Sequence, residues 1–170
     1  MSIVYRNRWL AVEKIRVRNA GKSYYLYCVG KRDIVVVLPL LDKDTIVLER
    51  QYRGVLGRYL YEIPAGYVEE GERPGKTAVR ELEEETGYRP GKMTFISKLA
   101  ESPGTLKLWA HFYIATDLKA GERSLDRNED IRILKVSLKK ALQMIKDRRI
   151  VDMKTVAAVC YYANLERGRS

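Results

Sequence analysis

Three glutamates in the middle of the chain are spaced so that a helix would place them on one face. Glu81 and Glu85 are four residues apart, and Glu84 lies three residues after Glu81. Positions separated by three or four residues are neighbours on a helix surface. Ala78 and Leu82 fall on an adjoining apolar stripe that would dock the helix against a core. The sequence therefore predicts three carboxylates on one patch of a docked helix.

This carboxylate patch would lower the stability of a helix, but it could bind a divalent cation. Like charges four residues apart destabilise a helix by about 0.2–0.5 kcal/mol, and the helix dipole disfavours anions near the carboxyl end. Mg²⁺ and Mn²⁺ prefer oxygen ligands and bind through a few carboxylates together with substrate phosphates. A solvated acidic face remains the alternative for the three residues taken alone, and we interpret the neighbouring Glu83 in that way.

The residues on either side of the patch complete a longer pattern. Pro64-Ala65-Gly66 indicates a tight turn, Arg80 can pair with a nearby acid such as Glu72, and Gly87 can end the helix. The spacing is Gly, five residues, Glu, seven residues, Arg-Glu, apolar, any, Glu-Glu, any, Gly and a last apolar position. From Gly66 to Tyr88 this resembles the Nudix box at every specified position.

The resemblance implies a fold and a chemistry. The fold would be of the α+β class, a Nudix-type α/β/α sandwich with a mixed β-sheet, here with an additional N-terminal antiparallel β region. The enzyme would cleave a nucleoside diphosphate linked to another group. It would use two or three ions of Mg²⁺, or Mn²⁺, which neutralise phosphate charge and activate a water.

The resemblance also assigns roles within the box. Metal ligands would be Glu81 and Glu85 with the Ala65 carbonyl, while Glu84 would be a ligand or would orient the attacking water. The residues that would hold the box in shape are Gly66, Glu72, Arg80 and Gly87.

Segments outside the box bear on the substrate. Arg50-Gln51-Tyr52-Arg53 and the run from Glu62 to Gly66 are similar to segments of ADP-ribose pyrophosphatases and related nucleotide-sugar hydrolases. Guanidinium groups suit phosphate oxygens, so Arg50 and Arg53 are candidate phosphate contacts. The resemblance implies a substrate-binding role for Glu62 as well. An ordinary surface pair at a strand end is the alternative for the two arginines. The Pro103-Gly104 turn, sixteen residues after Gly87, resembles the proline position that marks the ADP-ribose group.

An acidic segment near residue 129 resembles the loop that supplies a further metal ligand or catalytic base in this group. Glu129 is the candidate for both roles. The chain departs from the pattern two residues earlier, where Arg127 replaces a common acid, although Asp126 is adjacent. It departs again at Lys107 and Leu108, where many ADP-ribose enzymes carry acids. These departures leave the identity of the base and a strict ADP-ribose preference open.

Composition bounds the remaining possibilities. The chain has 170 residues, a formal net charge of +10 and 46% hydrophobic residues, as expected for one folded domain. The longest apolar run is Ile34–Leu41, against about 20 residues needed to span a bilayer, so no membrane partner and a cytoplasmic location are expected. The basic residues are scattered among acids, which makes a nucleic acid partner unlikely. We interpret Cys28 and Cys160 as buried and His111 as structural.

Periodicity and turn residues predict the elements that position these groups. Strands are expected at 9–17, 24–29, 34–40, 45–48, 93–99, 108–116 and 132–136. Helices are expected at about 74–87, 137–148 and 152–165, followed by a loose tail at 166–170. Residues 34–165 would form the Nudix core. By resemblance, the strands of residues 1–33 would lie at the interface of a homodimer, where Trp9, Tyr24 or Tyr25 could stack a base or simply pack the sheet.

The leading functional hypothesis is a metal-dependent hydrolase that cleaves ADP-ribose, a small nucleoside-diphosphate substrate, to AMP and ribose 5-phosphate. The nearest alternative is another nucleotide sugar such as GDP-mannose. An RNA-end pyrophosphohydrolase, suggested by the basic charge, and a non-catalytic nucleotide-binding regulator are weaker alternatives. The regulator is disfavoured because all three box carboxylates, Glu81, Glu84 and Glu85, are present.

Overall fold

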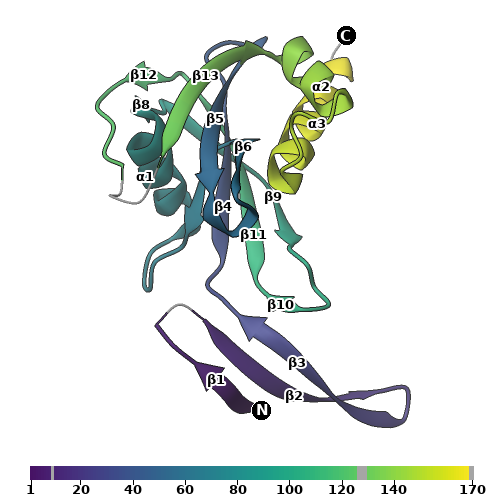
Figure 1. Cartoon of the computed structure of the whole chain (residues 1–170). Coiled ribbons are helices and arrows are strands. Elements are labelled where there is room, and N and C mark those ends of the chain that lie inside the picture. Colours follow the sequence, from purple (N-terminus) through teal and green to yellow (C-terminus); the bar gives the residue numbers. More distant parts are fainter. Residues whose placement is uncertain (9, 126–129, 169–170) are drawn as a thin grey trace.

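The computed structural model describes residues 1–8, 10–125 and 130–168. Helices cover both faces of a group of β-sheets (Figure 1). Helix α1, Pro74–Thr86, lies on one side, whereas α2, Leu138–Lys146, and α3, Met153–Arg167, lie together on the other. The arrangement is the α/β/α sandwich of the α+β class that the sequence analysis expected.

Strand β4, Ile34–Pro39, is buried along its whole length between these helical layers. Because side chains alternate along a strand, its two faces belong to two different hydrophobic clusters. Val36 and Leu38 pack with α2 and α3 residues, and Val35 and Val37 pack with Ala78 and Leu82 of α1, as the apolar stripe predicted. This second cluster fixes α1, and with it the carboxylate patch, against the sheet.

The central sheet has the order β7-β4-β11-β9 and is mixed. Strand β11 runs parallel to β4, and the other pairs are antiparallel. A second sheet, β13-β5-β6, is antiparallel, and a short β8–β12 pair lies near the carboxyl end of α1. The remaining bounds in these sheets are β5 Thr45–Arg53, β6 Arg58–Glu62, β7 Ala65–Tyr67, β8 Tyr88–Arg89, β9 Lys92–Ala100, β11 Trp109–Thr116, β12 Lys119–Ala120 and β13 Ile131–Ser137. A 3₁₀ turn, Gly54–Leu56, joins β5 to β6.

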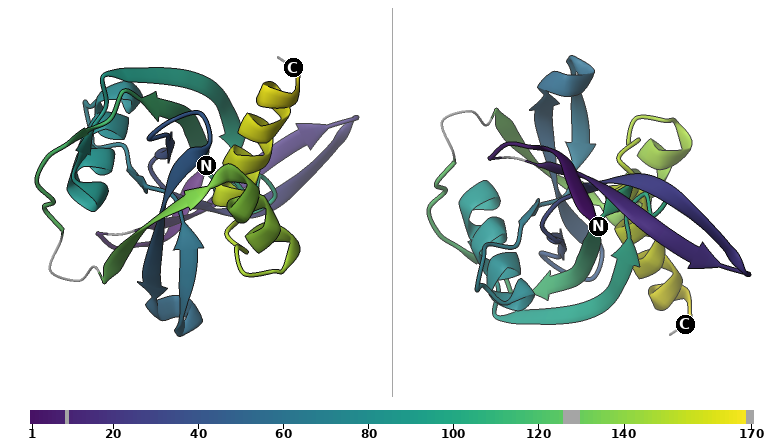
Figure 2. Two further views of the ribbon diagram at one scale, coloured as in Figure 1. Left: turned by 90° about the horizontal axis from the view of Figure 1, so that it is seen from above. Right: turned by 90° about the horizontal axis from the view of Figure 1, so that it is seen from below.

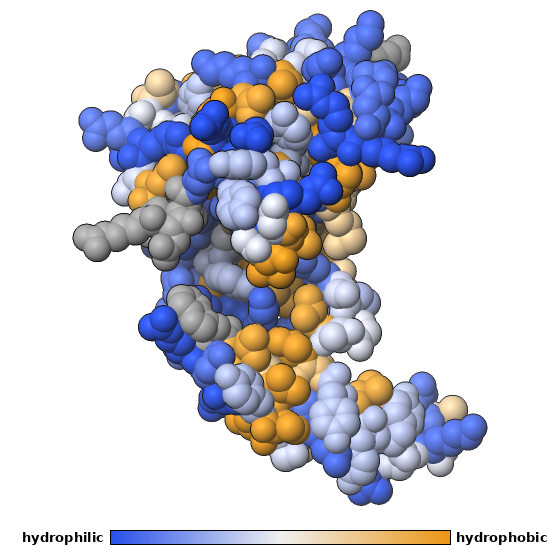
Figure 3. All heavy atoms as spheres, in the orientation of Figure 1, coloured by the Kyte–Doolittle hydropathy of each residue, from blue (hydrophilic) through white to orange (hydrophobic). Residues whose placement is uncertain are grey.

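The first three strands form an arm that projects from the core (Figures 1 and 2). They are β1, Ser2–Arg6, β2, Ala11–Asn19, and β3, Lys22–Gly30, and the short β10, Leu106–Lys107, pairs in parallel with β3. We call residues 1–8 and 10–30 the N-terminal arm. Hydrophobic side chains gather on part of its surface (Figure 3). Its exposed large apolar or aromatic residues are Met1, Ile3, Val4, Tyr5, Tyr24, Tyr25, Leu26 and Tyr27.

Most predicted helix bounds are confirmed. Pro74 is the first residue of α1, and Gly87 caps its end with a φ of 75°. Ser137 and Asp152, predicted as the first helical residues, instead cap the amino ends of α2 and α3 through side-chain oxygens. Helix α3 continues to Arg167, so the start of the expected loose tail is helical.

Two other expectations need correction. Cys28 is buried, but Cys160 is exposed because Val159, Tyr162 and Ala163 take the inward positions of α3. Strand β5 continues to Arg53, five residues beyond the predicted end at residue 48, since its polar second half pairs with both β6 and β13. Among the described residues, no helix has the length and apolar character that a bilayer crossing needs.

Candidate active site

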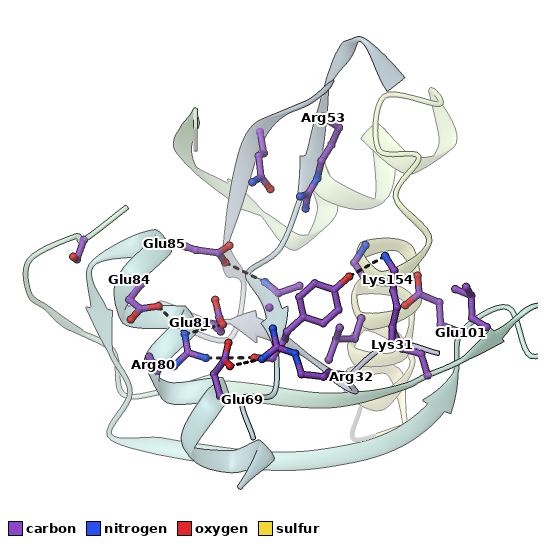
Figure 4. A pocket seen from close by; sticks show the side chains of 18 residues that line it. Lys31, Arg32, Arg53, Glu69, Arg80, Glu81, Glu84, Glu85, Glu101 and Lys154 are labelled. Atoms are coloured by element: carbon purple, nitrogen blue, oxygen red, sulfur yellow. Dashed lines mark hydrogen bonds and ion pairs between the residues drawn. The ribbon is translucent and has the colours of Figure 1, made fainter. Parts of the chain in front are cut away.

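A cavity of about 520 Å³ lies between α1, the β7 turn, the end of β5 and the start of α3. Charged side chains dominate its wall. Three box carboxylates project from α1 on one side, while Lys31, Arg53 and Lys154 lie across the cavity from them (Figure 4). The charged residues that line it are Lys31, Arg32, Arg53, Arg80, Lys154, Glu69, Glu81, Glu84, Glu85 and Glu101. Cations and carboxylates therefore face a common space large enough for a small ligand.

Gly66 allows the carboxylate of Glu81 to approach the β7 backbone. A Cβ atom added at Gly66 would lie 2.1 Å from Cδ of Glu81 and 2.2 Å from its Oε1. Real side chains do not come so close, so any other residue at this position would displace the carboxylate or the turn. Glycine at this position therefore leaves the carboxylate of Glu81 its place against the turn.

Glu85 is fixed by the same turn. Its carboxylate is buried, and Oε2 accepts a hydrogen bond from the backbone N–H of Ala65 at 3.1 Å. The backbone carbonyl of Glu85 accepts from Nε of Arg123 at 2.7 Å, and Nη2 of Arg123 donates to the carbonyl of Ile131 at 3.1 Å. Arg123 thus ties the carboxyl end of α1 to the start of β13, which lies immediately beyond the acidic segment.

Arg80 is the centre of the ion-pair network. Nη1 lies 2.8 Å from Oε1 of Glu81 and 2.8 Å from Oε2 of Glu84, and Nη2 lies 3.3 Å from Oε2 of Glu72. Partial burial disfavours the charged form of Arg80, but the hydrogen bond with Glu72 and the nearby carboxylates outweigh it and raise its pKa. The same hydrogen bond lowers the pKa of Glu72. Arg80 therefore offsets the repulsion within the patch and anchors the loop before α1.

Arg53 and Glu62 form a second, more buried pair. Nε and Nη2 of Arg53 donate to Oε1 and Oε2 of Glu62 at 2.7 and 2.6 Å, a two-pronged arrangement. Glu62 is 1% exposed, and its hydrogen bond with Arg53 raises the pKa of that guanidinium. Arg53 lines the cavity, whereas Glu62 does not. Glu62 therefore orients the Arg53 side chain without contacting the cavity itself.

Residues that join the arm to the core form the outer wall of the cavity. Lys31 donates to the hydroxyl of Tyr67 at 3.1 Å, and the guanidinium of Arg32 lies 5.5 Å from the centre of the Tyr67 ring. Arg32 also pairs with Glu69. Lys31 and Arg32 belong to no sequence motif, and Tyr67 and Glu69 fall at unspecified positions of the box. The passage of the chain from the arm into β4 beside the box loop brings the four residues together.

The comparison with protein families decides the assignment. A model of the NUDIX domain matches residues 30–156. The chain belongs to the NUDIX family. It is a Nudix hydrolase by sequence, with the box on the turn–helix unit that forms one wall of the cavity.

Two relatives are similar over nearly the whole chain. The ADP-ribose pyrophosphatase of Bacillus subtilis (strain 168) is 39% identical over 154 residues, which cover 89% of this chain and 83% of that protein. The methanol dehydrogenase activator of Bacillus methanolicus is 43% identical, also over 154 residues, with coverages of 89% and 83%. A solved structure of an ADP compounds hydrolase matches with a TM-score of 0.87 over 99% of this chain and 92% of that one. At 23% identity, this structure shows the shared fold.

Nudix hydrolases generally use divalent metal ions, and the donor set here fits them. Glu81, Glu84 and Glu85 supply hard oxygen ligands on one wall of one cavity. In the described part of the chain, no three such side chains come close enough together to coordinate one ion. Instead, Glu81 and Glu84 form ion pairs with Arg80, and Glu85 accepts a hydrogen bond from the Ala65 N–H. Binding a cation would therefore require these carboxylates to exchange partners, which charged groups on a cavity wall can do.

Several expected site residues lie outside the cavity. Gln51 and Arg53 lie on one face of β5, and Arg50 lies on the opposite face. The guanidinium of Arg50 is 3.7 Å from the centre of the Tyr59 ring. Arg50 therefore does not line the cavity, and its expected contact with substrate stays a prediction. Pro103 and Gly104 form an exposed turn beyond Glu101, which does line the cavity. Glu129, with Asp126 and Arg127, lies outside the described residues.

The cavity also includes residues that the sequence analysis missed. Gln51, buried at 6% exposure, precedes Arg53 by two positions and therefore shares its face of β5. Strand alternation from Arg53 would have found it. His111, expected to be structural, bonds to Asp33 at 3.0 Å and does not line the cavity. Glu83, expected to be solvated, pairs with Arg89 at 3.3 Å on the far side of α1.

Proposed function

We propose that the protein hydrolyses the diphosphate bond of ADP-ribose to give AMP and ribose 5-phosphate. The observation that carries the proposal is the cavity wall, on which Glu81, Glu84 and Glu85 face the cations Arg53 and Lys154. Carboxylates can hold divalent cations while the basic side chains bind phosphate oxygens directly. The similarity to an ADP-ribose pyrophosphatase over most of both chains supports the choice of substrate.

The chemistry needs one water and one broken P–O bond. Water adds to one phosphorus, the bridging oxygen leaves with the other phosphate, and two monophosphates result. Bound Mg²⁺ or Mn²⁺, two or three ions per site, would neutralise phosphate charge and lower the pKa of the attacking water. In our proposal Glu81, Glu85 and the Ala65 carbonyl hold these ions, and Glu84 orients the water.

Glu129 remains our candidate for a further ligand or the catalytic base. The support comes from its described neighbours. Ser124 lines the cavity, its N–H donates to the carbonyl of Glu84 at 3.1 Å, and Arg123 bonds to the carbonyl of Ile131. Residues on both sides of Glu129 are therefore held beside the carboxyl end of α1.

Arg53 is our candidate for binding the diphosphate. Its pairing with buried Glu62 fixes the guanidinium at the cavity wall, so less side-chain entropy is lost when a phosphate binds. The roles of Arg50, Pro103 and Gly104 in substrate binding stay predictions, which would require a rearrangement or a second subunit.

We further propose a homodimer assembled through the N-terminal arm, and a cytoplasmic location. The arm exposes Tyr25 and Tyr27 at 57% and 56%, with other apolar residues around them, and such clustered surface suits an interface. Both cysteines are free thiols, which suits a reducing compartment.

A panel of nucleoside diphosphate derivatives with Mg²⁺ tests the substrate, with products separated by chromatography. We expect ADP-ribose to yield AMP and ribose 5-phosphate. Disappearance of GDP-mannose while ADP-ribose stays intact would overturn the substrate assignment. The Glu85→Gln variant should lose several orders of magnitude in turnover, since it removes a ligand charge. Glu83→Gln, on the far side of the same helix, is the matched control and should keep the activity.

A further inference from the structure

A second, smaller cavity adjoins the candidate active site on its outer side. Its volume is about 270 Å³, and Arg32 and Tyr67 line both cavities. The remaining wall comes from the turn between β1 and β2 of the N-terminal arm. All its lining residues are Arg6, Asn7, Arg8, Leu10, Ala11, Arg32 and Tyr67. Three guanidinium groups and no carboxylate therefore line it among the described residues.

The turn between β1 and β2 holds two of these arginines. The Asn7 N–H donates to the carbonyl of Leu10 at 3.0 Å, and its side-chain oxygen accepts from the Leu10 N–H at 3.0 Å. Asn7 also bonds through Nδ2 to the Tyr5 hydroxyl at 3.2 Å. Arg6 and Arg8 stand on either side of this fixed residue, and both reach the same cavity.

The third arginine, Arg32, lines both the larger and the smaller cavity. It pairs with Glu69, which lines the larger cavity only. Glu69 therefore offsets part of the charge of Arg32, and the arm adds Arg6 and Arg8 to the wall of the smaller cavity.

We propose that this cavity is an anion subsite for a second phosphoryl group carried by the substrate. The preferred substrates would be nucleoside diphosphate derivatives with an additional phosphomonoester on a ribose. Such a ligand would place its diphosphate against the carboxylate patch and its extra phosphate among Arg6, Arg8 and Arg32. Guanidinium forks match phosphate oxygens, and the ring of Tyr67 separates the two anionic groups. The inference rests on the proposed function for the location of the diphosphate.

The test compares ADP-ribose with ADP-ribose 2′-phosphate. Wild-type protein should show a higher kcat/KM for the phosphorylated probe. Arg6→Gln and Arg8→Gln should each reduce that preference by about ten- to 100-fold, the range for losing one hydrogen bond to a charged group. Arg18→Gln, an exposed arm residue outside this cavity, should retain the preference. Each variant lowers the net charge equally, so long-range attraction of the substrate is matched.

A binding measurement separates this inference from the proposed function. Calorimetry of both probes in a chelating buffer reports affinity without turnover. Tighter binding of ADP-ribose 2′-phosphate by wild type, lost in Arg6→Gln and kept in Arg18→Gln, would support the subsite even if ADP-ribose were not cleaved. Equal affinity for the two probes, or equal losses in Arg6→Gln and Arg18→Gln, would overturn it even if ADP-ribose were cleaved rapidly.

Discussion

The carboxylate of Glu81 lies against the backbone of Gly66, in space that a Cβ atom at position 66 would overlap. A Cβ at position 66 would lie 2.1 Å from the carboxylate carbon of Glu81. The first residue of the box pattern and one of its carboxylates, fifteen positions apart in the sequence, are thus one structural unit. The spacing of the pattern reflects this contact as well as the geometry of the helix.

Replacing Gly66 with alanine should therefore impair catalysis. The added methyl group must displace the Glu81 carboxylate or the β7 turn, and a misplacement of about 1 Å costs about 100-fold in rate. Steady-state kinetics with ADP-ribose measures kcat/KM for the variant. The control is Gly75→Ala in the first turn of α1, where an added Cβ would come no closer than 3.9 Å to the Tyr113 hydroxyl. Equal activity of Gly66→Ala and Gly75→Ala would argue against a role for this contact.

The Arg53–Glu62 pair should contribute to stability as well as to the site. Glu62→Gln leaves a half-buried guanidinium without its charged partner, and we expect the free energy of unfolding to fall by about 2–4 kcal/mol. Urea denaturation measures this loss. The matched variant is Glu69→Gln, which breaks the exposed Arg32–Glu69 pair and should cost less than about 1 kcal/mol. Similar losses in the two variants would show that burial does not distinguish the pairs.

Acid should weaken the anchor of the loop before α1. The hydrogen bond from Arg80 lowers the pKa of Glu72 below its ordinary value of 4.5. Its stabilising effect is complete above pH 4.5 and is lost as the pH falls through the lower pKa of the folded state. Unfolding experiments between pH 6 and pH 3 should show wild type and Glu72→Gln converging in stability at the acid end. A constant difference between the two proteins across this range would contradict the assignment.

The N-terminal arm should control the oligomeric state. Introducing charge at Tyr25 and Tyr27 by substitution with aspartate should abolish the proposed dimer, because two charges would be desolvated at the interface. Sedimentation equilibrium should give twice the 19.7 kDa chain mass for wild type and the single chain mass for the variant. Tyr161→Asp, at an exposed position of α3, serves as the control and should remain dimeric. A monomeric wild-type protein would exclude the dimer.

The parts of the site that depend on one local element were predictable from the sequence. Helical spacing placed Glu81, Glu84 and Glu85 on one patch, and Pro74 and Gly87 marked the ends of the helix. These properties arise within about twenty residues. The same local logic predicted three strands of the central sheet, β4, β9 and β11, and the apolar run of β4 is buried between the helical layers.

The rest depends on contacts between distant segments. The shared motif does not distinguish Arg50 from Arg53, yet strand alternation places Arg50 against Tyr59 and Arg53 at the cavity. Lys31 and Arg32 reach the site only because the chain leaves the arm beside the box loop. No local spacing carries that information, since it arises from how the arm joins the core.

Divalent cation uptake by the intact protein tests the central claim most directly. Titration with Mn²⁺, followed by calorimetry and by the electron spin resonance of the free ion, should show saturable binding that strengthens when nucleotide is present. Glu81→Gln and Glu85→Gln should weaken that binding by about tenfold or more, whereas Glu83→Gln should leave it unchanged. Absence of Mn²⁺ or Mg²⁺ binding in the presence of nucleotide, or equal binding by all three variants, would contradict the assignment of these carboxylates as the metal site.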